Sequence, residues 1–174
     1  MRTTVVSLLF LAISYQIAIG QYSIRPIPSI ELETLSGNKC NFQSLVKDKK
    51  NLMIIFSWGC CFGDPCLKIL DSLEKYYQEL EKDYDIKVLS LNYKICKTTW
   101  QECSKKSVEK NRWTHPFYWY DDYDAFSNCF FIRGGTCPSL VILNSVNNTF
   151  SNEEIGFSSF KKDVEEKLKP YKKQ

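Results

Sequence analysis

A continuous apolar run over residues 51–58, "NLMIIFSW", constrains the fold more than any other feature of this sequence. Charged residues precede it, and it shows no alternation of polar and apolar positions. Such a run is typical of a strand that is covered on both faces, which requires helices on both sides of a sheet. The segments at 86–93, "IKVLSLNY", and 139–144, "SLVILN", predict two further buried strands.

Segments with helical spacing separate these runs. Apolar residues recur at helical spacing from Leu70 to Leu80, and Asp64 followed by Pro65 predicts the start of this helix. Asp64 would be the N-cap and Pro65 the first helical residue. Further helices are expected over residues 98–111, near 122–127 and from Phe160 to Leu168. Strands that alternate with helices in this way predict an α/β fold.

The first twenty residues differ from the remainder. Arg2 precedes the apolar stretch "VVSLLFLAIS", and small residues stand just before Gln21. This pattern predicts a secretory signal peptide over residues 1–20, and an uncleaved anchor is the alternative. The rest of the chain has no repeat, low-complexity block or linker. We therefore expect one domain over residues 21–174, secreted or periplasmic, with no membrane segment after cleavage of the signal.

Composition excludes several classes of protein. Hydrophobic residues make up 44% and charged residues 25%, which is globular composition and argues against disorder. The formal net charge of +3 is too small and too evenly spread to indicate nucleic-acid binding. No nucleotide-binding loop or Ser/His/Asp set is visible, so the cysteines remain the main candidates for chemistry.

Eight cysteines all lie after residue 20: Cys40, Cys60, Cys61, Cys66, Cys96, Cys103, Cys129 and Cys137. An exported chain with an even number of cysteines is expected to contain disulfides. Cys60 could pair with Cys137 or remain a buried thiol, and Cys96 could close a small loop with Cys103. Cys129 could reach Cys137 or Cys40. The sequence does not choose among these pairings.

Several of these features together resemble a known fold. The buried strand is followed by a cysteine pair with proline before its second member, a helix, another strand and the later segment "RGGTCPSLVIL". This order resembles the thioredoxin fold over about residues 27–168. The N-terminal preamble and the "WTHPFY" stretch are closest to exported thiol–disulfide reductases of the cytochrome-c-maturation type. The resemblance implies a central mixed sheet with helices on both faces and an N-terminal extension.

The resemblance also implies residue roles. Counting from Phe56 makes Cys61 the attacking thiol, and the Pro-Cys pair makes Cys66 the resolving thiol. Pro138 matches the family proline whose preceding peptide bond is cis, and Cys137 would then lie beside the pair, with Cys60 as a second accessory thiol. The chain would be a monomeric thiol–disulfide oxidoreductase acting on cysteine-containing proteins. We expect no organic cofactor and no metal.

This sequence also departs from the family pattern. The spacing is Cys-x4-Cys, two residues longer than in the family, and Asp64 adds negative charge between the thiols. Ile55 stands where many relatives have a buried carboxylate. These departures keep open a static disulfide in a non-catalytic binding module. A soft-metal site is a lesser alternative, because His115 does not match the ligand position of copper-delivery relatives and is expected to be a half-exposed turn residue.

Overall fold

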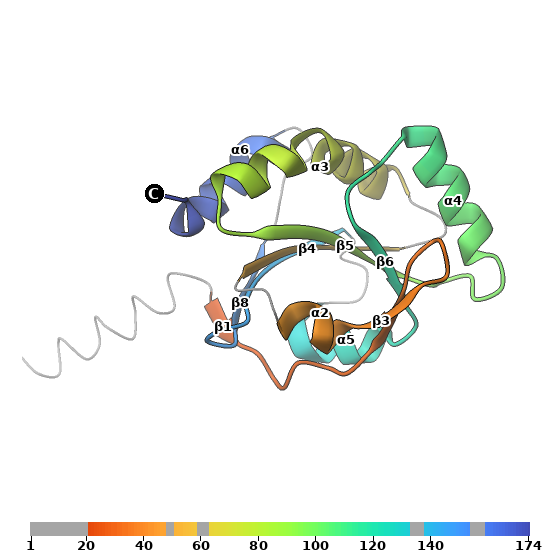
Figure 1. Ribbon diagram of the computed structural model, residues 1–174, viewed down its shortest axis with the longest axis horizontal. Coiled ribbons are helices and arrows are strands. Elements are labelled where there is room, and N and C mark those ends of the chain that lie inside the picture. The colour runs from red at the N-terminus through yellow and green to blue at the C-terminus, as the bar shows by residue number, and fades with distance from the viewer. Residues whose placement is uncertain (1–20, 48–50, 59–62, 133–137, 154–158) are drawn as a thin grey trace, which may run out of the picture.

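The computed structural model describes residues 21–47, 51–58, 63–132, 138–153 and 159–174. Its centre is an eight-stranded sheet in the order β1-β8-β7-β4-β5-β6-β2-β3 (Figure 1). The strands are β1 (Gln21–Ser23), β2 (Glu31–Glu33), β3 (Lys39–Asn41), β4 (Asn51–Trp58), β5 (Lys87–Tyr93), β6 (Phe117–Tyr120), β7 (Ser139–Asn144) and β8 (Thr149–Glu153). The sheet is mixed, because β4 pairs in parallel with β5 and antiparallel with β7.

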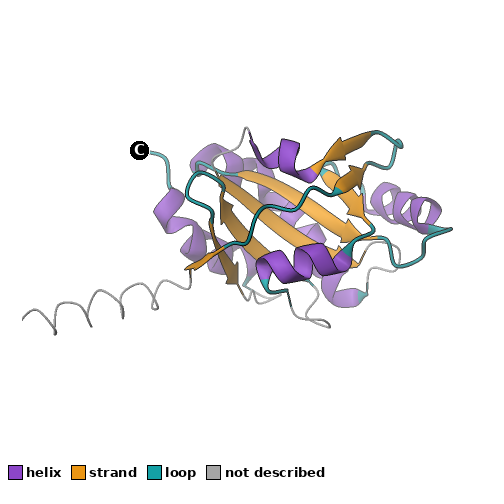
Figure 2. Cartoon of the chain, turned by 90° about the horizontal axis from the view of Figure 1, so that it is seen from below, coloured by secondary structure: helices purple, strands orange, loops and turns teal. Residues whose placement is uncertain are grey.

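Helices cover both faces of this sheet, as the sequence predicts. They are α2 (Phe42–Lys47), α3 (Asp64–Asp83), α4 (Trp100–Asn111), α5 (Tyr123–Phe130) and α6 (Phe160–Leu168), followed by the short 3₁₀ helix η1 (Lys169–Tyr171). Figure 1 shows α3 and α6 over one face and α2 and α5 over the other, with α4 beyond β6, and Figure 2 shows helices packed against the sheet in the view from below. The predicted architecture is therefore confirmed.

The central strand β4 shows why the continuous apolar run is needed. All six residues from Leu52 to Ser57 are buried, although side chains alternate between the two faces of a strand. Ile54 and Phe56 pack into an aromatic core with residues of α2 and α5. Met53 and Ile55 pack into a second core with residues of α3 and α6. Two helical layers therefore require two apolar faces on the same strand.

Helix α3 begins one residue earlier than the sequence predicts. Its N-cap is Gly63, whose carbonyl oxygen accepts a hydrogen bond from the Leu67 N–H at 3.1 Å. Asp64 is therefore the first helical residue rather than the N-cap, and Pro65 is the second. Proline suits its position near the helix start, because it lacks only an N–H that would have no helical partner.

The N-terminal segment forms more sheet than expected. Tyr22 pairs with Phe150, which makes β1 the edge strand beside β8. The short strand β3 is a further addition, formed where Cys40 pairs with Leu32. The predicted signal peptide, residues 1–20, lies outside the described residues. No helix in the described ranges is long and apolar enough to cross a membrane.

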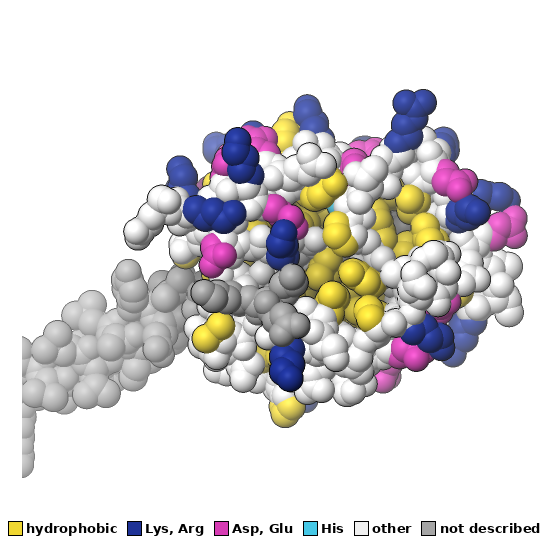
Figure 3. All heavy atoms as spheres, in the orientation of Figure 1, with side chains coloured by type: hydrophobic (Ala, Val, Ile, Leu, Met, Phe, Trp, Pro, Cys, Tyr) yellow, Lys and Arg dark blue, Asp and Glu magenta, His cyan; other side chains and the backbone are white. Residues whose placement is uncertain are grey.

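Charge is distributed evenly over the face seen in Figure 3. Basic and acidic side chains are interspersed there around a central group of hydrophobic side chains. Several pairs are exposed and close, such as Lys106 with Glu102 at 2.6 Å. This distribution agrees with the small net charge of the chain.

Candidate active site

The candidate site lies where β4 ends and α3 begins. Trp58 is the last residue of β4, and Gly63 precedes the first residue of α3. The predicted thiols Cys60 and Cys61 fall in residues 59–62, and Cys137 falls in residues 133–137, so all three lie outside the described residues. The structure places the other two predicted site residues, Cys66 and Pro138.

Cys66 is the third residue of α3 and is only 4% exposed. It belongs to the same apolar cluster as Ile55 and Leu140. Burial raises the pKa of the Cys66 thiol, and a hydrogen bond from the Trp58 backbone opposes this effect. The sulfur is thus tied to the carboxyl end of β4 and remains protonated at neutral pH.

Pro138 lies at the same edge of the sheet. It directly precedes β7, whose first residue, Ser139, pairs with Phe56 of β4. Because β7 runs antiparallel to β4, the start of β7 meets the end of β4, close to Trp58. The peptide bond before Pro138 involves Cys137 and lies outside the described residues. The fold therefore brings Cys66 and Pro138 to one edge, although 72 positions separate them in the sequence.

The neighbourhood of Cys66 is apolar at Ile55, the position at which the resemblance to thiol–disulfide reductases implied a departure from a buried carboxylate. Ile55 is fully buried and its side chain shares a cluster with Cys66. The nearest polar feature along the strand is Ser57, whose hydroxyl donates to the Asn92 side-chain oxygen. Asn92 in turn donates to the Tyr118 carbonyl oxygen at 3.1 Å. None of these groups titrates near neutral pH, so Ile55 leaves its position without a proton-transfer group.

The expectation for His115 was wrong. Its side chain is buried, with the residue 2% exposed, and both ring nitrogens have partners. Nδ1 lies 2.7 Å from a Glu74 carboxylate oxygen, and Nε2 lies 3.0 Å from the Ser90 hydroxyl. Burial lowers the pKa of His115 to about 4, against the opposing effect of Glu74. "THP" reads locally as a turn, and nothing in the sequence links it to a glutamate 41 residues earlier.

All five described cysteines are free thiols: Cys40, Cys66, Cys96, Cys103 and Cys129. Cys96 and Cys103 both pack against a cluster built on Trp100 and Trp119, but no bond joins them. The Cys129 sulfur lies 3.9 Å from the Arg25 carbonyl oxygen, and burial raises its pKa to about 11. The suggested bridge between Cys129 and Cys40 is therefore absent as well, and the suggested pairings of Cys60 and Cys137 involve residues outside the described part of the chain. Within that part, no group of three or more potential metal ligands occurs.

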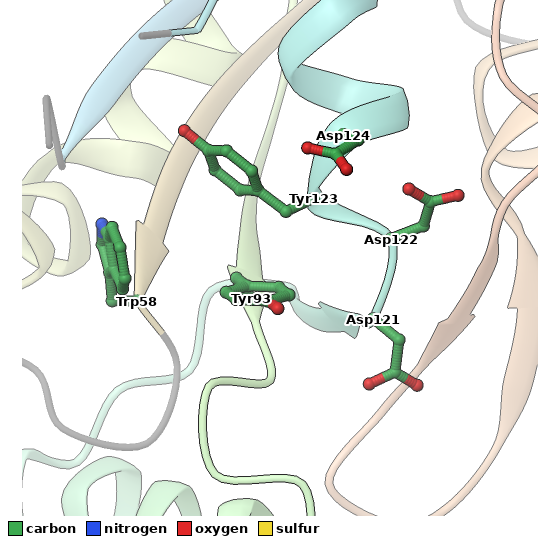
Figure 4. A pocket seen from close by; sticks show the side chains of 6 residues that line it. All are labelled: Trp58, Tyr93, Asp121, Asp122, Tyr123 and Asp124. Atoms are coloured by element: carbon green, nitrogen blue, oxygen red, sulfur yellow. The ribbon is translucent and has the colours of Figure 1, made fainter. Parts of the chain in front are cut away.

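A pocket of about 450 Å³ opens at the same edge of the sheet, on the α5 face (Figure 4). It is lined by Trp58, Tyr93, Asp121, Asp122, Tyr123 and Asp124. These residues come from the carboxyl ends of β4 and β5 and from the start of α5. This pocket was not predicted from the sequence, because its lining residues come from separate segments of the chain.

Comparison with solved structures decides what kind of fold this is. An uncharacterized thioredoxin-like protein from Porphyromonas gingivalis superposes with a TM-score of 0.60 at 18% identity, covering 85% of this chain and 95% of that one. A secreted thiol-disulfide isomerase from Corynebacterium glutamicum gives 0.61 at 15% identity, covering 87% and 90%. This chain has a thioredoxin fold. The thioredoxin domain of a thiol-disulfide oxidoreductase from Bacteroides vulgatus is similar at 17% identity, with coverage of 84% and 98% and a TM-score of 0.60.

The thioredoxin fold predicted from the sequence is therefore confirmed. No family model matches the sequence, and the search of curated proteins gives no significant match. At these identities the likeness establishes the fold, and the activity has to be argued from the site itself.

Proposed function

We propose that this thioredoxin-fold chain is an exported thiol–disulfide oxidoreductase of the kind found in cytochrome-c maturation, exchanging disulfides with cysteine-containing proteins. Cys61 would be the nucleophile, Cys66 the resolving thiol and Pro138 the residue that orients the substrate. The observation that carries the proposal is the position of Cys66: a buried thiol in the first turn of α3, tied to the end of β4 at the edge where Pro138 directly precedes β7.

The chemistry of Cys66 suits a resolving role. Its raised pKa keeps it protonated while another thiolate makes the first attack. The N-terminus of α3 provides unpaired N–H groups and a favourable dipole, which stabilise the thiolate when Cys66 does react. Both properties support a second step that follows the first attack. Cys60 and Cys137 would be accessory thiols near this pair.

The proposed exchange transfers two electrons between the Cys61–Cys66 pair and a substrate disulfide. The Cys61 thiolate attacks one sulfur of a substrate disulfide, a mixed disulfide forms, and the other substrate sulfur leaves as a thiolate that takes up a proton. The Cys66 thiolate then attacks the Cys61 sulfur, and the second substrate thiol leaves. The Cys61–Cys66 pair is oxidised by two electrons and the substrate disulfide is reduced. The reverse sequence oxidises a substrate dithiol.

Export of the chain forms part of the proposal. It rests on the signal-peptide pattern of residues 1–20 and on the even number of cysteines in the remainder. A neighbour in fold is described as secreted, which agrees with this setting. The mature chain would act in the periplasm or outside the cell as a monomer.

One observation favours a second candidate function. Ile55 is fully buried against Cys66, so the position lacks the acid that would help to deprotonate the resolving thiol. A non-catalytic thioredoxin-fold binding module, with Cys61 and Cys66 in a permanent disulfide, would need no such acid. The two candidates differ in whether that bond opens at physiological potentials.

Differential alkylation tests this point directly. The protein from residue 21 would be equilibrated in glutathione buffers of about −300 to −180 mV and then alkylated and mapped by peptide mass spectrometry. The oxidoreductase predicts a Cys61–Cys66 bond that opens within this range. A bond that stays closed throughout contradicts catalysis and favours the binding module. Insulin reduction by Cys61→Ser, with Cys103→Ser as the matched control, should be lost only in the first variant.

A further inference from the structure

The pocket at the carboxyl ends of β4 and β5 has two kinds of wall. Trp58 and Tyr93 are register partners on neighbouring strands, and their ring centroids lie 6.3 Å apart. The Tyr123 ring lies 5.6 Å from that of Tyr93 and 6.4 Å from that of Trp58. Figure 4 shows the two tyrosines between Trp58 on one side and three aspartates on the other. An aromatic wall therefore faces a negatively charged one.

The three carboxylates of this pocket differ in whether they have a hydrogen-bond or ion-pair partner. Asp122 caps α5 by accepting a hydrogen bond from the Ala125 N–H at 3.0 Å. Asp121 lies 3.4 Å from the Lys94 ammonium group, which is held more closely by Glu33 at 2.8 Å. Asp124 is exposed, and its carboxylate has no ion-pair or hydrogen-bond partner among the described residues. One full negative charge therefore remains free at the aromatic wall.

Tyr123 is a side chain of the aromatic wall whose polar group has no partner among the described residues. The Tyr123 hydroxyl is buried and has no hydrogen-bond partner, in a side chain that lines the pocket. Buried hydroxyl groups in folded proteins are nearly always hydrogen-bonded, because leaving one without a partner is costly. Figure 4 shows this hydroxyl on the side of Trp58, away from the carboxylates. This oxygen has almost no accessible surface, so the contact that Tyr123 offers a ligand in the pocket is the face of its ring.

We propose that this pocket binds an arginine side chain that flanks the disulfide of a protein substrate. A guanidinium group can stack on the tyrosine rings and pair with the Asp124 carboxylate, and its flat, weakly hydrated shape suits such a site better than an ammonium group. That the arginine belongs to a disulfide substrate rests on the proposed function. Binding of the arginine side chain itself does not require redox chemistry.

The location fits this role. Trp58 belongs both to the pocket and to the end of β4, where its backbone contacts Cys66. The pocket lies on the α5 face of the sheet and Cys66 on the α3 face. Cys61 lies three positions after Trp58 in the sequence. A residue next to a substrate cystine could therefore occupy the pocket while the cystine meets Cys61.

Binding can be measured without any redox step. Two blocked hexapeptides would be titrated by calorimetry into the protein from residue 21: Arg-Ser-Gly-Gly-Ser-Gly and its twin with citrulline, in which a neutral urea replaces the guanidinium group. We expect the arginine peptide to bind about fivefold more tightly. This preference should fall when NaCl is raised from about 0.05 M to about 0.5 M, because salt screens charges near the surface.

Variants assign the preference to this pocket. Asp124→Asn should bring the two peptides to within about twofold of each other. Asp83→Asn, which removes an exposed carboxylate at the far end of α3, should leave the fivefold preference intact. Equal binding of the twins to the wild-type protein would overturn the proposal. A preference that persists in Asp124→Asn would overturn its assignment to these residues.

A second experiment separates this inference from the proposed function. Pre-reduced protein would be mixed with the cyclic disulfide peptides Arg-Cys-Gly-Gly-Cys-Gly and its citrulline twin, and peptide dithiol would be followed by acid quench and mass spectrometry. A faster reaction with the arginine peptide in the wild-type protein, and equal rates in Asp124→Asn, support both the oxidoreductase function and the arginine pocket. Absence of exchange with either peptide contradicts the oxidoreductase, while the calorimetric preference still decides what the pocket binds.

Discussion

His115 Nδ1 lies 2.7 Å from a Glu74 carboxylate oxygen and thereby joins the middle of α3 to the segment before β6. The same carboxylate accepts hydrogen bonds from the Thr114 N–H at 2.8 Å, the Thr114 hydroxyl at 2.6 Å and the His115 N–H at 3.0 Å. One acidic side chain thus satisfies four donors from two consecutive residues. Since α3 also carries Cys66 at its start, this contact helps to hold the helix of the candidate site in place.

Glu74→Ala should therefore destabilise the fold by about 2–4 kcal/mol, because it leaves the His115 ring N–H buried without a partner. Urea unfolding followed by circular dichroism measures the free energy of unfolding. Glu79→Ala, on the same helix, removes a partly exposed ion pair with Lys161 and should cost less than about 1 kcal/mol. Equal losses in the two variants would show that the Glu74 network contributes nothing beyond a surface pair.

His115 should also make stability depend on pH. Burial, opposed by Glu74, lowers its pKa from 6.5 to about 4 in the folded chain. The unfolded chain therefore binds a proton at a higher pH than the folded chain does. The stability associated with neutral His115 is complete above about pH 6.5 and is lost as the pH falls toward 4, by about 3 kcal/mol at most.

Unfolding free energies from pH 7.5 to 4 would test this slope. In His115→Gln the decrease over this window should be much smaller than in the wild-type protein, whatever the stability of the variant at pH 7. Glu74 contributes little to the slope of the unfolding free energy above pH 5. Burial raises its pKa, but hydrogen bonds from Thr114 and His115 outweigh burial and lower the pKa below the usual 4.5. An unchanged slope in His115→Gln would mean that other groups cause the pH dependence.

The outcome for His115 shows where the sequence is informative. The buried strand β4, the helix after it and the closing helix were all predicted, because each is encoded in a local pattern of apolar residues. The contact between Glu74 and His115, and the pairing of Tyr22 with Phe150, join residues far apart in the chain and leave no local pattern. The pocket was missed for the same reason, since its aromatic walls come from three separate segments.

The candidate site was predicted only in part. Pro65 and Cys66 at a helix start are a local signal, and the structure places them in the first turn of α3. The meeting of Cys66 and Pro138 at one edge of the sheet depended on the resemblance to a known fold, because antiparallel pairing of β7 with β4 cannot be read from either strand alone. Burial of Cys66 by Ile55 follows from the same packing.

Cys66→Ser should trap the mixed disulfide that the proposed mechanism requires. Without a resolving thiol, Cys61 would keep its partner, so oxidised glutathione should leave one stable adduct of about 305 Da on this residue. Intact-mass and peptide mass spectrometry give the amount and position of the adduct. Cys103→Ser, which removes a thiol packed against Trp100 and Trp119, should resolve its adduct as the wild-type protein does. A Cys66→Ser protein without an adduct at Cys61 contradicts the assigned roles.

Lys94 is the most buried lysine or arginine among the described residues. Its ion pair with Glu33 joins the end of β5 to β2. Its ammonium group lies 2.8 Å from Glu33, 3.4 Å from Asp121 and 4.7 Å from the centre of the Trp100 ring. Lys94→Ala leaves the Glu33 carboxylate largely buried without a counter-charge. We expect a loss of about 2–4 kcal/mol, since removing one partner of a buried pair costs more than the pair contributes.

Thermal and urea unfolding would measure this loss against Lys106→Ala, whose partner Glu102 is exposed at the surface of α4. The control should cost less than about 0.5 kcal/mol, as is usual for exposed pairs on a helix. Lys94→Met keeps the apolar stem that lies beside Trp100 but removes the charge. If Lys94→Met is as stable as the wild-type protein, packing of the stem against Trp100 dominates and the ion pair with Glu33 is not what stabilises this edge of the sheet.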